Sequence, residues 1–477
     1  MSHAILIKYK MRKTKIIATI GPKTDTEEMM EKLIKNGVDV FRFNMKHGDV
    51  EWHKERIQRA RKIAKKLNQT IGIFIDLQGP EIRIETKDKE SLCVRKGSEF
   101  LLSDKFYDNI PTVKVSDPII FKSLEIGDQV LIDDGFQEFK VIEKNDKGLI
   151  LRSRENYVIE YRKGLNLPGK RINLPSLIEN DYEKLKMAKE VGVDFVALSF
   201  CRNKKDIDIL KEEIKKLGLN LGIIAKIENK EALENIDEII ENVDSIMIAR
   251  GDLGIENPIE EIAYIQKQII EKCREKNVSV IVATQMLQSM VQNSRPTRAE
   301  ATDVANAIFN ETDAIMLSGE TATGEHPIRA VQTMNKIVVF NEDKKEKYFR
   351  NKISFDNHTE LIVETAAHIL NLDRNNKIDK TIVLTDSGYT ARTISSHRLP
   401  DEIIAITKNE LTRNMLKLSF GIVSYFIDYE NKKNKMRHLI GELKKANIVK
   451  NGDCILLISG RKLDIKNVEN SIKILNI

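Results

Sequence analysis

Two neighbouring segments decide the fold: Ile223-Ile-Ala-Lys-Ile-Glu-Asn229 and Ser245-Ile-Met-Ile-Ala-Arg-Gly-Asp-Leu-Gly254. Each begins with a short apolar run and ends in charged residues, a pattern typical of a buried parallel strand. The residues between them, 229–243, combine acidic residues with the apolar spacing of a helix. The stretch therefore predicts a strand–helix–strand unit.

The ends of these two strands carry charged side chains. Because side chains alternate along a strand, Lys226 and Glu228 share one face, and Asp252 follows the next strand. Charge at the end of a buried strand is costly unless it has a partner or a function. Two carboxylates from neighbouring strand ends suit Mg²⁺, and Lys226 beside them suits a developing anion. A structural network of ion pairs is the alternative.

Composition narrows the class of protein. A chain of 477 residues is long enough for roughly two to four domains. The formal charge is only +6, and Lys and Arg alternate with Glu and Asp, which argues against a nucleic-acid partner. No apolar run predicts a membrane span, and the first residues lack a signal-peptide pattern. The four cysteines are widely spaced, which argues against disulfides and zinc and predicts a cytoplasmic protein.

The strand–helix alternation extends in both directions from the opening stretch. The predicted strands are residues 14–21, 38–45, 70–77, 194–200, 221–227, 245–250, 278–284 and 314–320. Eight such units are the number that closes a (β/α)₈ barrel, so we predict an α/β fold built on a TIM barrel.

Two further regions interrupt or follow this alternation. After Gly79, short alternating runs separated by turns predict an all-β insert without a helix. The charged stretch 341–352 predicts a linker, and renewed alternation beyond it predicts a C-terminal α/β domain. The predicted domains are 1–79 with 169–345 for the barrel, 80–168 for the β-rich lid and 346–477 for the C-terminal domain.

Polar residues gather at the C-terminal ends of the barrel strands, where TIM barrels carry their active sites. They are Arg42, Asn44, Asp76, Lys226, Glu228, Asp252 and Thr284. A second candidate is the C-terminal loop of residues 385–390, which joins a strand to a helix. Its Thr385, Ser387, Gly388 and Thr390 suit the phosphate of an effector, and a simple N-cap turn is the alternative.

Motifs along nearly the whole chain resemble those of the pyruvate kinase family. They are Thr19-Ile-Gly-Pro22, Arg42-Phe-Asn44, Gly79-Pro-Glu-Ile-Arg83, Gly164-Leu-Asn-Leu-Pro-Gly169, Ala225-Lys-Ile-Glu-Asn229, Ala249-Arg-Gly-Asp-Leu-Gly254, Ala283-Thr-Gln-Met286, Arg295-Pro-Thr-Arg-Ala-Glu300 and Met316-Leu-Ser-Gly-Glu-Thr321. The resemblance implies a cytoplasmic glycolytic phosphotransferase that converts phosphoenolpyruvate and ADP into pyruvate and ATP. It also implies Mg²⁺ or Mn²⁺ as cofactor, a homotetramer, and the architecture of barrel, lid and C-terminal domain.

The resemblance also implies a role for each matched residue on the phosphoryl side. Glu228 and Asp252 would hold the divalent metal, and Lys226 and Arg42 would bind the transferring phosphoryl group. Phosphoryl transfer requires mostly positioning and charge neutralisation, which these residue types supply.

The remaining matches concern the substrate and the nucleotide. Thr284 would help a proton reach the enolate carbon, and the backbone at Gly251 and Asp252 would hold the substrate carboxylate. The nucleotide side is matched by Asn44, His47, Arg83 and Lys163. Because Arg83 and Lys163 lie near the two ends of the lid, lid closure would bring their charge to the phosphates and exclude water.

The chain departs from the family at the monovalent-cation site. Where the family has Asn-Phe-Ser-His, this chain has Asn44-Met-Lys-His47, and Asp76-Leu-Gln-Gly79 replaces Asp-Thr-Lys-Gly. The family binds K⁺ through the Asn, Ser and Asp side chains and one backbone carbonyl, for which Leu77 is the candidate here.

Lys46 takes the place of the serine, and a lysine has no acceptor for a cation. We expect the Lys46 ammonium to occupy the K⁺ position, with Asn44 and Asp76 accepting its hydrogen bonds, so that the enzyme works without K⁺. This would differ from K⁺-independent relatives, which usually carry a lysine at the position of Glu81. The alternative is that Lys46 points to solvent and activity is impaired.

Two other functions compete with this interpretation. One is a barrel lyase or aldolase that uses Mg²⁺ to stabilise a pyruvate enolate, but the lid with Arg83 and Lys163 favours a nucleotide. The other is a non-catalytic homologue that senses metabolites through its C-terminal domain. Its support is the departures at Lys46 and at Leu77-Gln78, and the retained Lys226 and Thr284 count against it.

Overall fold

The computed structural model describes residues 12–344, 355, 357–373, 375, 377–428, 435–459 and 470–477. At its centre, parallel strands form a closed barrel in the order β1-β2-β3-β13-β14-β15-β16-β17. Their bounds are β1 (Lys15–Thr19), β2 (Val40–Asn44), β3 (Gly72–Asp76), β13 (Phe195–Leu198), β14 (Gly222–Ile227), β15 (Ser245–Ala249), β16 (Ser279–Ala283) and β17 (Ala314–Leu317). Each predicted barrel strand is present, which confirms the TIM barrel.

Helices cover the outside of the barrel. They are α1 (Glu27–Lys35), α2 (Val50–Lys66), α4 (Glu179–Val191), α5 (Lys204–Lys216), α6 (Lys230–Glu234), α7 (Ile236–Ile240), α8 (Arg250–Glu256), α9 (Ile262–Glu275), α10 (Arg298–Phe309), α11 (Gly319–Ala322) and α12 (Pro327–Lys344). Local sequence explains them: α1 begins at Thr26, whose hydroxyl accepts from Met29 N, and buries Met30, Leu33 and Ile34 on one face.

Two expectations for this region were wrong. Helix α8 was not predicted, because its sequence holds two glycines and little apolar periodicity. Residues 341–344 belong to α12 and not to a linker, since the helix continues into the charged stretch. The rest of that predicted linker, 345–352, and the predicted domain boundary at 345–346 lie outside the described residues.

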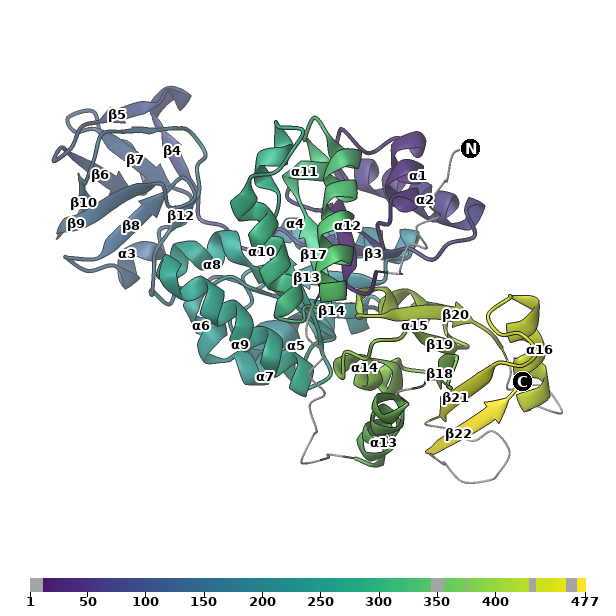
Figure 1. The fold of residues 1–477 in the computed structure, drawn as a ribbon. Coiled ribbons are helices and arrows are strands. Elements are labelled where there is room, and N and C mark those ends of the chain that lie inside the picture. The colour runs from purple at the N-terminus through teal and green to yellow at the C-terminus, as the bar shows by residue number, and fades with distance from the viewer. Residues whose placement is uncertain are drawn as a thin grey trace.

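The lid is a β-rich insert between β3 and β13 (Figure 1). Its strands are β4 (Ile84–Thr86), β5 (Leu92–Val94), β6 (Glu99–Ser103), β7 (Thr112–Val115), β8 (Gln129–Ile132), β9 (Gln137–Asn145), β10 (Gly148–Ser153), β11 (Tyr157–Ile159) and β12 (Leu165–Asn166). An edge-to-face pair of Phe100 and Phe139, with ring centroids 5.0 Å apart, lies in its separate core. The expectation that the insert has no helix was wrong, because a short helix α3 (Ile120–Ser123) is present.

The C-terminal domain lies at the end of the barrel opposite the lid (Figure 1). Its sheet has the order β20-β19-β18-β21-β22, with only β22 antiparallel to its neighbour. The elements are α13 (His358–Leu372), β18 (Lys380–Leu384), α14 (Tyr389–Ser396), β19 (Ile403–Thr407), α15 (Glu410–Met415), β20 (Ile422–Phe426), α16 (Lys435–Lys445), β21 (Cys454–Ser459) and β22 (Ser471–Asn476). The predicted α/β domain is confirmed, and the numerical domain boundaries stay predictions.

Apolar side chains fill the barrel interior, and the C-terminal domain closes its floor. Phe74, Phe195 and Met247 belong to one buried cluster inside the barrel. Leu418 joins this cluster and Met415 packs against it, both from the segment that leads into β20. The barrel floor is therefore completed by residues far away in sequence.

Four aspartates repeat one arrangement at this floor. Asp39, Asp194, Asp244 and Asp313 each stand directly before every second strand, namely β2, β13, β15 and β17. Each carboxylate accepts a hydrogen bond from the backbone N–H of the second residue of the preceding strand, at distances from 2.7 to 3.1 Å. The same hydrogen bond, from the backbone of one strand to an aspartate before the next strand, therefore occurs four times around the barrel.

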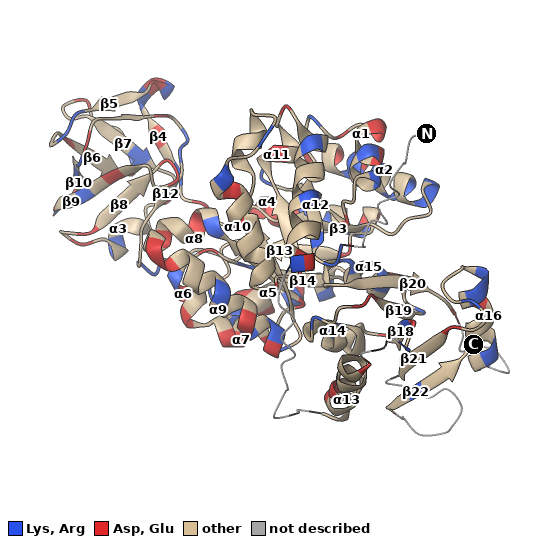
Figure 2. Ribbon diagram, in the orientation of Figure 1, with Lys and Arg blue, Asp and Glu red and all other residues tan. Residues whose placement is uncertain are grey.

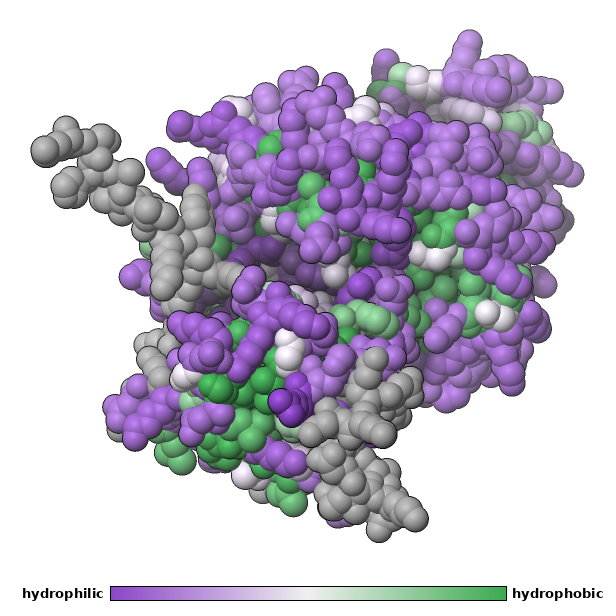
Figure 3. Space-filling view, turned by 90° about the vertical axis from the view of Figure 1, so that its right-hand side faces the viewer, coloured by the Kyte–Doolittle hydropathy of each residue, from purple (hydrophilic) through white to green (hydrophobic). Residues whose placement is uncertain are grey.

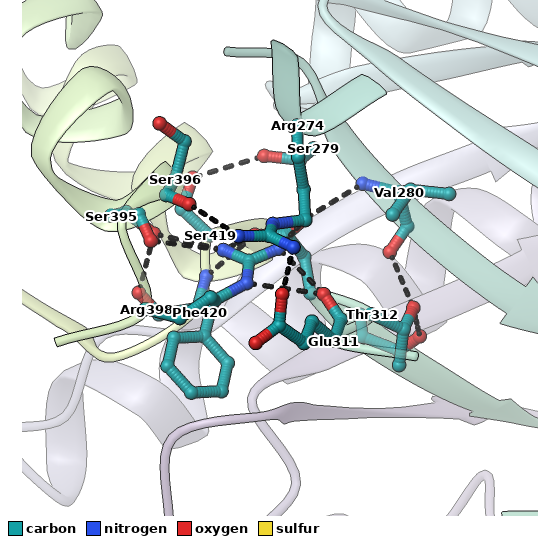
Figure 4. Close-up of polar contacts among 12 residues, drawn as sticks. Arg274, Ser279, Val280, Glu311, Thr312, Ser395, Ser396, Arg398, Ser419 and Phe420 are labelled. Carbon is teal, nitrogen blue, oxygen red and sulfur yellow. Dashed lines mark hydrogen bonds and ion pairs between the residues drawn. The ribbon is translucent and has the colours of Figure 1, made fainter. Parts of the chain in front are cut away.

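Asp313 also fastens the C-terminal domain to the barrel. Arg398 NH2 donates to Asp313 Oδ2 at 2.8 Å, and Phe420 N donates to Oδ1 at 2.9 Å. Arg398 also donates to the carbonyl of Glu311 at 2.7 Å, and its guanidinium lies 4.7 Å from the centroid of the Phe420 ring. Figure 4 shows Arg398 near Phe420 and Glu311, with Arg274 forming a neighbouring ion pair with Glu311. This buried polar junction fixes the domain beneath the barrel.

Charged residues are spread over the described chain, and Figure 2 shows Lys and Arg interspersed with Asp and Glu on all three domains. None of the described helices is both long enough and apolar enough to cross a membrane.

Candidate active site

The C-terminal end of β2 places Arg42 beside Asp76 at the end of β3. Arg42 Nε donates to Asp76 Oδ2 at 2.7 Å, and NH1 donates to Thr19 Oγ1 at 3.1 Å. Both side chains are buried, at 9% and 1% exposure of the residues. Burial opposes ionisation of Asp76, but the charges of Lys226 and Arg42 outweigh it and hold the pKa of this carboxyl below its usual range.

Lys226 lies between two carboxylates. Its Nζ is 2.9 Å from Glu228 Oε1 and 3.4 Å from Asp76 Oδ1, and it donates to Ser199 Oγ at 2.8 Å. Ser199 in turn donates to the carbonyl of Leu77 at 2.7 Å. Burial alone would lower the pKa of Lys226, but Asp76 and Glu228 raise it above its usual value. A buried, permanently cationic ammonium is the result.

Glu228 and Asp252 supply the carboxylates expected at the strand ends. Glu228 is 2% exposed, and its Oε2 accepts from Phe200 N at 2.6 Å. Phe200 adopts φ = 54°, a left-handed conformation that few non-glycine residues take. Burial and the charge of Glu228 raise the pKa of Asp252 to about 7. Two mutually repelling carboxylates with oxygen donors fit a hard divalent cation such as Mg²⁺.

Thr284 lies on the neighbouring strand end and is tied to helix α8. Its Oγ1 accepts from Gly251 N at 2.8 Å and donates to the carbonyl of Ala283 at 2.6 Å. The φ of Thr284 is 67°, so this side chain is held by a strained backbone at the site. Arg250 supports the same turn by donating to the Thr284 carbonyl at 2.8 Å.

A cleft of about 150 Å³ separates these strand ends from the lid. Glu228 and Asp252 line its barrel side, and Glu81 and Asp134 line its lid side. The cleft therefore joins the carboxylate pair to the base of the lid.

The two predicted lid cations already have acidic partners. Arg83 NH2 donates to Glu81 Oε2 at 2.8 Å. Lys163 Nζ lies 2.8 Å from Asp133 Oδ1 and 3.0 Å from Glu160 Oε2, and hydrogen bonds to these two groups raise the pKa of Lys163 to about 12. Both cations are one-third exposed, and within the described chain no hydrogen bond or ion pair joins either of them to Lys226.

Comparison with known proteins decides the family. The barrel-domain model of pyruvate kinase matches residues 11–331, and the alpha/beta-domain model matches residues 363–475. The chain is 39% identical to a pyruvate kinase of Staphylococcus epidermidis, covering 97% of this chain and 80% of the relative. It is likewise 39% identical to one of Bacillus licheniformis, covering 94% and 78%. A crystal structure of a pyruvate kinase from Cryptosporidium parvum superposes with a TM-score of 0.87 at 33% identity, covering 98% of this chain and 96% of that one.

The chain belongs to the pyruvate kinase family. It is accordingly a kinase, a transferase of glycolysis, and the resemblance predicted from its motifs is confirmed.

Within this pyruvate kinase framework, the structure corrects the expected partners of Lys46. Its Nζ lies 3.0 Å from Glu81 Oε1, and Asn44 Oδ1 accepts from the Lys46 backbone N–H at 3.2 Å. The predicted hydrogen bonds from the ammonium to Asn44 and Asp76 were therefore wrong. They were expected because Asp76 was taken to lack compensation, whereas Arg42 and Lys226 already neutralise it.

His47 lies next to this pair on the nucleotide side predicted for the family. It is largely but not fully exposed, its backbone N–H donates to the Asn44 carbonyl at 3.4 Å, and its own carbonyl contacts His53 Nε2 at 2.6 Å. Partial burial and the charges of Lys46, Arg42 and Arg83 lower the pKa of His47. The imidazole is thus neutral at physiological pH.

The loop of residues 385–390 forms the turn before α14. Thr385 Oγ1 accepts from Gly388 N at 3.0 Å, and Gly388 caps the helix with φ = 83°. Thr385 and Thr390 are buried, while Ser387 is exposed. The Thr385 hydroxyl therefore takes part in an N-cap turn, and Asp386 places a carboxylate within the same loop.

Sequence patterns missed two residues that hold the site together. Ser199 links Lys226 to the Leu77 carbonyl, and Glu81 bridges Lys46 and Arg83. Ser199 stands at a strand end, which is the signal that could have marked it. Glu81 lies inside a matched motif, but its two contacts come from separate segments.

Proposed function

We propose that the chain transfers the phosphoryl group of phosphoenolpyruvate to ADP, giving pyruvate and ATP. The observation that carries this proposal is the buried Lys226 ammonium, 2.9 Å from Glu228 in a site that opens beneath the lid. A fixed, buried cation stabilises the charge on a transferring phosphoryl group, and Arg42 adds a second cation from β2.

In this proposal Glu228 and Asp252 hold Mg²⁺ or Mn²⁺, which when bound neutralises charge on substrate and phosphoryl oxygens. The Thr284 hydroxyl helps deliver a proton to the enolate carbon, and the backbone at Gly251 and Asp252 helps hold the substrate carboxylate. Asn44, His47, Arg83 and Lys163 form the nucleotide side, reached when the lid closes over the cleft.

We further propose that the reaction runs without K⁺. Lys46 supplies a tethered ammonium next to the cation site, where it pairs with Glu81 rather than with Asn44 or Asp76, and the Leu77 carbonyl accepts from Ser199. A lysine cannot ligate K⁺, and its positive charge opposes binding of a second cation nearby.

We also propose that the protein is a homotetramer and is located in the cytoplasm. Apolar side chains are exposed on helices of the barrel and on the C-terminal domain, including Ile259, Phe340, Leu372 and Ile474, which are 84%, 63%, 70% and 56% exposed. Figure 3 shows apolar surface on the C-terminal domain. Such surface supports association through both regions. The four cysteines are free thiols, as suits a reducing compartment.

Phosphate binding by Thr385, Ser387, Gly388 and Thr390 stays a prediction. The turn geometry and the charge of Asp386 favour the structural alternative, an N-cap turn.

The test is the initial rate of pyruvate formation from phosphoenolpyruvate and ADP with Mg²⁺ in tetramethylammonium buffer. Turnover that depends on both substrates and on Mg²⁺ supports the proposal. Pyruvate formed without ADP would require transfer of the phosphoryl group to water and would contradict a phosphotransferase. Binding without turnover would favour a sensing homologue.

A further inference from the structure

A glycine stands at each of the two connections between the lid and the barrel, and the backbone N–H of each glycine donates to a carboxylate of the barrel. Gly79 and Gly169 have φ values of 67° and 70°, which favour glycine. Gly79 N lies 3.2 Å from Asp181 Oδ2, and Gly169 N lies 3.2 Å from Glu256 Oε2. Each hinge is therefore held by one acidic side chain.

The two carboxylates have different surroundings. Asp181 is fully buried in the first turn of α4 and also accepts from Gln78 N at 2.9 Å and Ile178 N at 3.0 Å, so it caps the helix. Glu256 ends α8 and is partly buried, and within the described chain its side chain accepts one hydrogen bond, that of Gly169. Asp181 therefore also stabilises the start of α4, whereas among the described residues Glu256 bonds only to Gly169.

Helix α8 connects this hinge to the reaction site. It is seven residues long, with Asp252 in its first turn and Glu256 at its end. Residues four apart lie on one face of a helix, about one turn from each other. The start of α8 is fixed by Arg250, which contacts Asp303 at 2.7 Å, and by the bond from Gly251 to Thr284.

The lid touches α8 at a second point. Gly135, in the turn between β8 and β9, lies against Ile255, and a Cβ at this glycine would be 3.3 Å from Ile255 Cγ1. Adjacent residues of α8 thus contact a lid turn and a lid hinge. A movement of the lid would therefore change both contacts of this helix.

We propose that Glu256 is a positioning residue that couples the lid to the helix carrying Asp252. By holding Gly169, it sets how the lid closes over the nucleotide without touching the substrates itself. This inference rests on the phosphotransferase function proposed above and names the residue that aligns its lid.

The test compares Glu256→Ala with Glu256→Gln in the full-length protein. Glu256→Ala removes the acceptor, so we expect the KM for ADP and the calorimetric Kd of Mg²⁺–ADP to rise by up to about tenfold, the upper end for losing one ordinary hydrogen bond. The KM for phosphoenolpyruvate and the melting temperature stay near wild-type values. Glu256→Gln keeps an oxygen acceptor for Gly169 and restores nucleotide affinity to within about threefold.

Glu234→Gln is the matched control, because it removes the exposed ion pair with Arg171 beside the same hinge. We expect little change, as is usual for an exposed pair. Hydrogen exchange of a peptide containing Gly169 gives an independent readout: Glu256→Ala accelerates it and Glu256→Gln does not.

The outcomes separate the two proposals. Wild-type nucleotide affinity in Glu256→Ala, or an equal loss for both substrates together with a lower melting temperature, would overturn the coupling role. A wild-type protein that binds ADP but does not turn over would refute the phosphotransferase, while the binding and exchange data would still decide the role of Glu256. A wild type that binds no ADP overturns both.

Discussion

The Lys46 ammonium lies 3.0 Å from Glu81 Oε1, and Glu81 also accepts from Arg83 at 2.8 Å through its other oxygen. One carboxylate at the entrance to the lid therefore bridges a lysine from the end of β2 and an arginine from the lid. In relatives with a serine at the position of Lys46, a bound monovalent cation is expected in this region.

The first prediction concerns K⁺. The wild type should show full activity in K⁺-free tetramethylammonium buffer, because Lys46 supplies the local charge. Lys46→Ser should lower the K⁺-free rate by about tenfold or more, the order of one lost charge contact at a reaction site. Added K⁺ should restore that rate.

Initial rates across a K⁺ titration check this prediction, with Lys54→Ser as the control because Lys54 pairs with Glu190 on an outer helix. A wild type that is nearly inactive until K⁺ is added would show that Lys46 does not replace the ion.

The second prediction concerns Lys226. Lys226→Met should reduce kcat by about 10²–10³-fold or more, since it removes a preorganised cation from the reacting phosphoryl group. It also leaves Asp76 and Glu228 with one cation fewer, so the melting temperature should fall.

Steady-state kinetics with thermal unfolding measures both effects. Lys272→Met on α9 is the matched control, because its ammonium pairs with Asp237 at the surface. Retention of a tenth of the wild-type kcat in Lys226→Met would contradict the role proposed for this side chain.

The barrel could be predicted because buried parallel strands leave short apolar runs that end in polar residues. Helix α8 could not be predicted, because Leu253 is its one buried residue and its two glycines leave no helical spacing of apolar residues. Its position follows from tertiary contacts of Arg250 and Gly251 with Thr284. The end of α12 was also misjudged: its last turn is as polar as a linker, so the charged residues 341–344 were predicted to lie outside the helix.

The sequence predicts most residues of the candidate site, but it does not predict which of them form hydrogen bonds and ion pairs with one another. Lys226 and Glu228 follow from alternation along one strand, and their 2.9 Å contact agrees with the shared face. Lys46 and Glu81 are 35 residues apart, and their contact depends on how the lid leaves β3. Ser199 acts through a hydroxyl, a group found at many strand ends, so only the fold reveals its bond to Lys226.

The third prediction concerns proton delivery by Thr284. Thr284→Ala should lower kcat by about 10²-fold, the range of a positioned proton-transfer group, and should slow deuterium incorporation into the methyl group of pyruvate in D₂O. Thr284→Ser keeps the hydroxyl and the bond from Gly251 N, so it should recover most of both rates. Proton NMR of the product measures the exchange, and unchanged exchange in the alanine variant would exclude Thr284 from this step.

The fourth prediction uses the fourfold aspartate repeat at the barrel floor. Asp313 and Asp244 make the same contact with the preceding strand, at 3.1 and 2.9 Å from its backbone nitrogen. Asp313 also binds Arg398, and both side chains are nearly buried, at 5% and 3% exposure. Within the described chain no hydrogen bond joins Asp244 to the C-terminal domain, and its link to that domain is the electrostatic interaction with Arg392 of α14. The two positions therefore differ mainly in the direct ion pair.

Removing one partner of a buried ion pair costs about 3–5 kcal/mol, because the other charge stays buried and unpaired. Asp313→Asn should therefore lower the melting temperature by several degrees and increase hydrogen exchange in the segment from Ser395 to Phe420. Asp244→Asn retains an amide oxygen for its backbone donor and should change the melting temperature little. Calorimetry and hydrogen exchange on the paired variants measure the difference, and equal destabilisation by both would mean that the aspartates stabilise only the barrel.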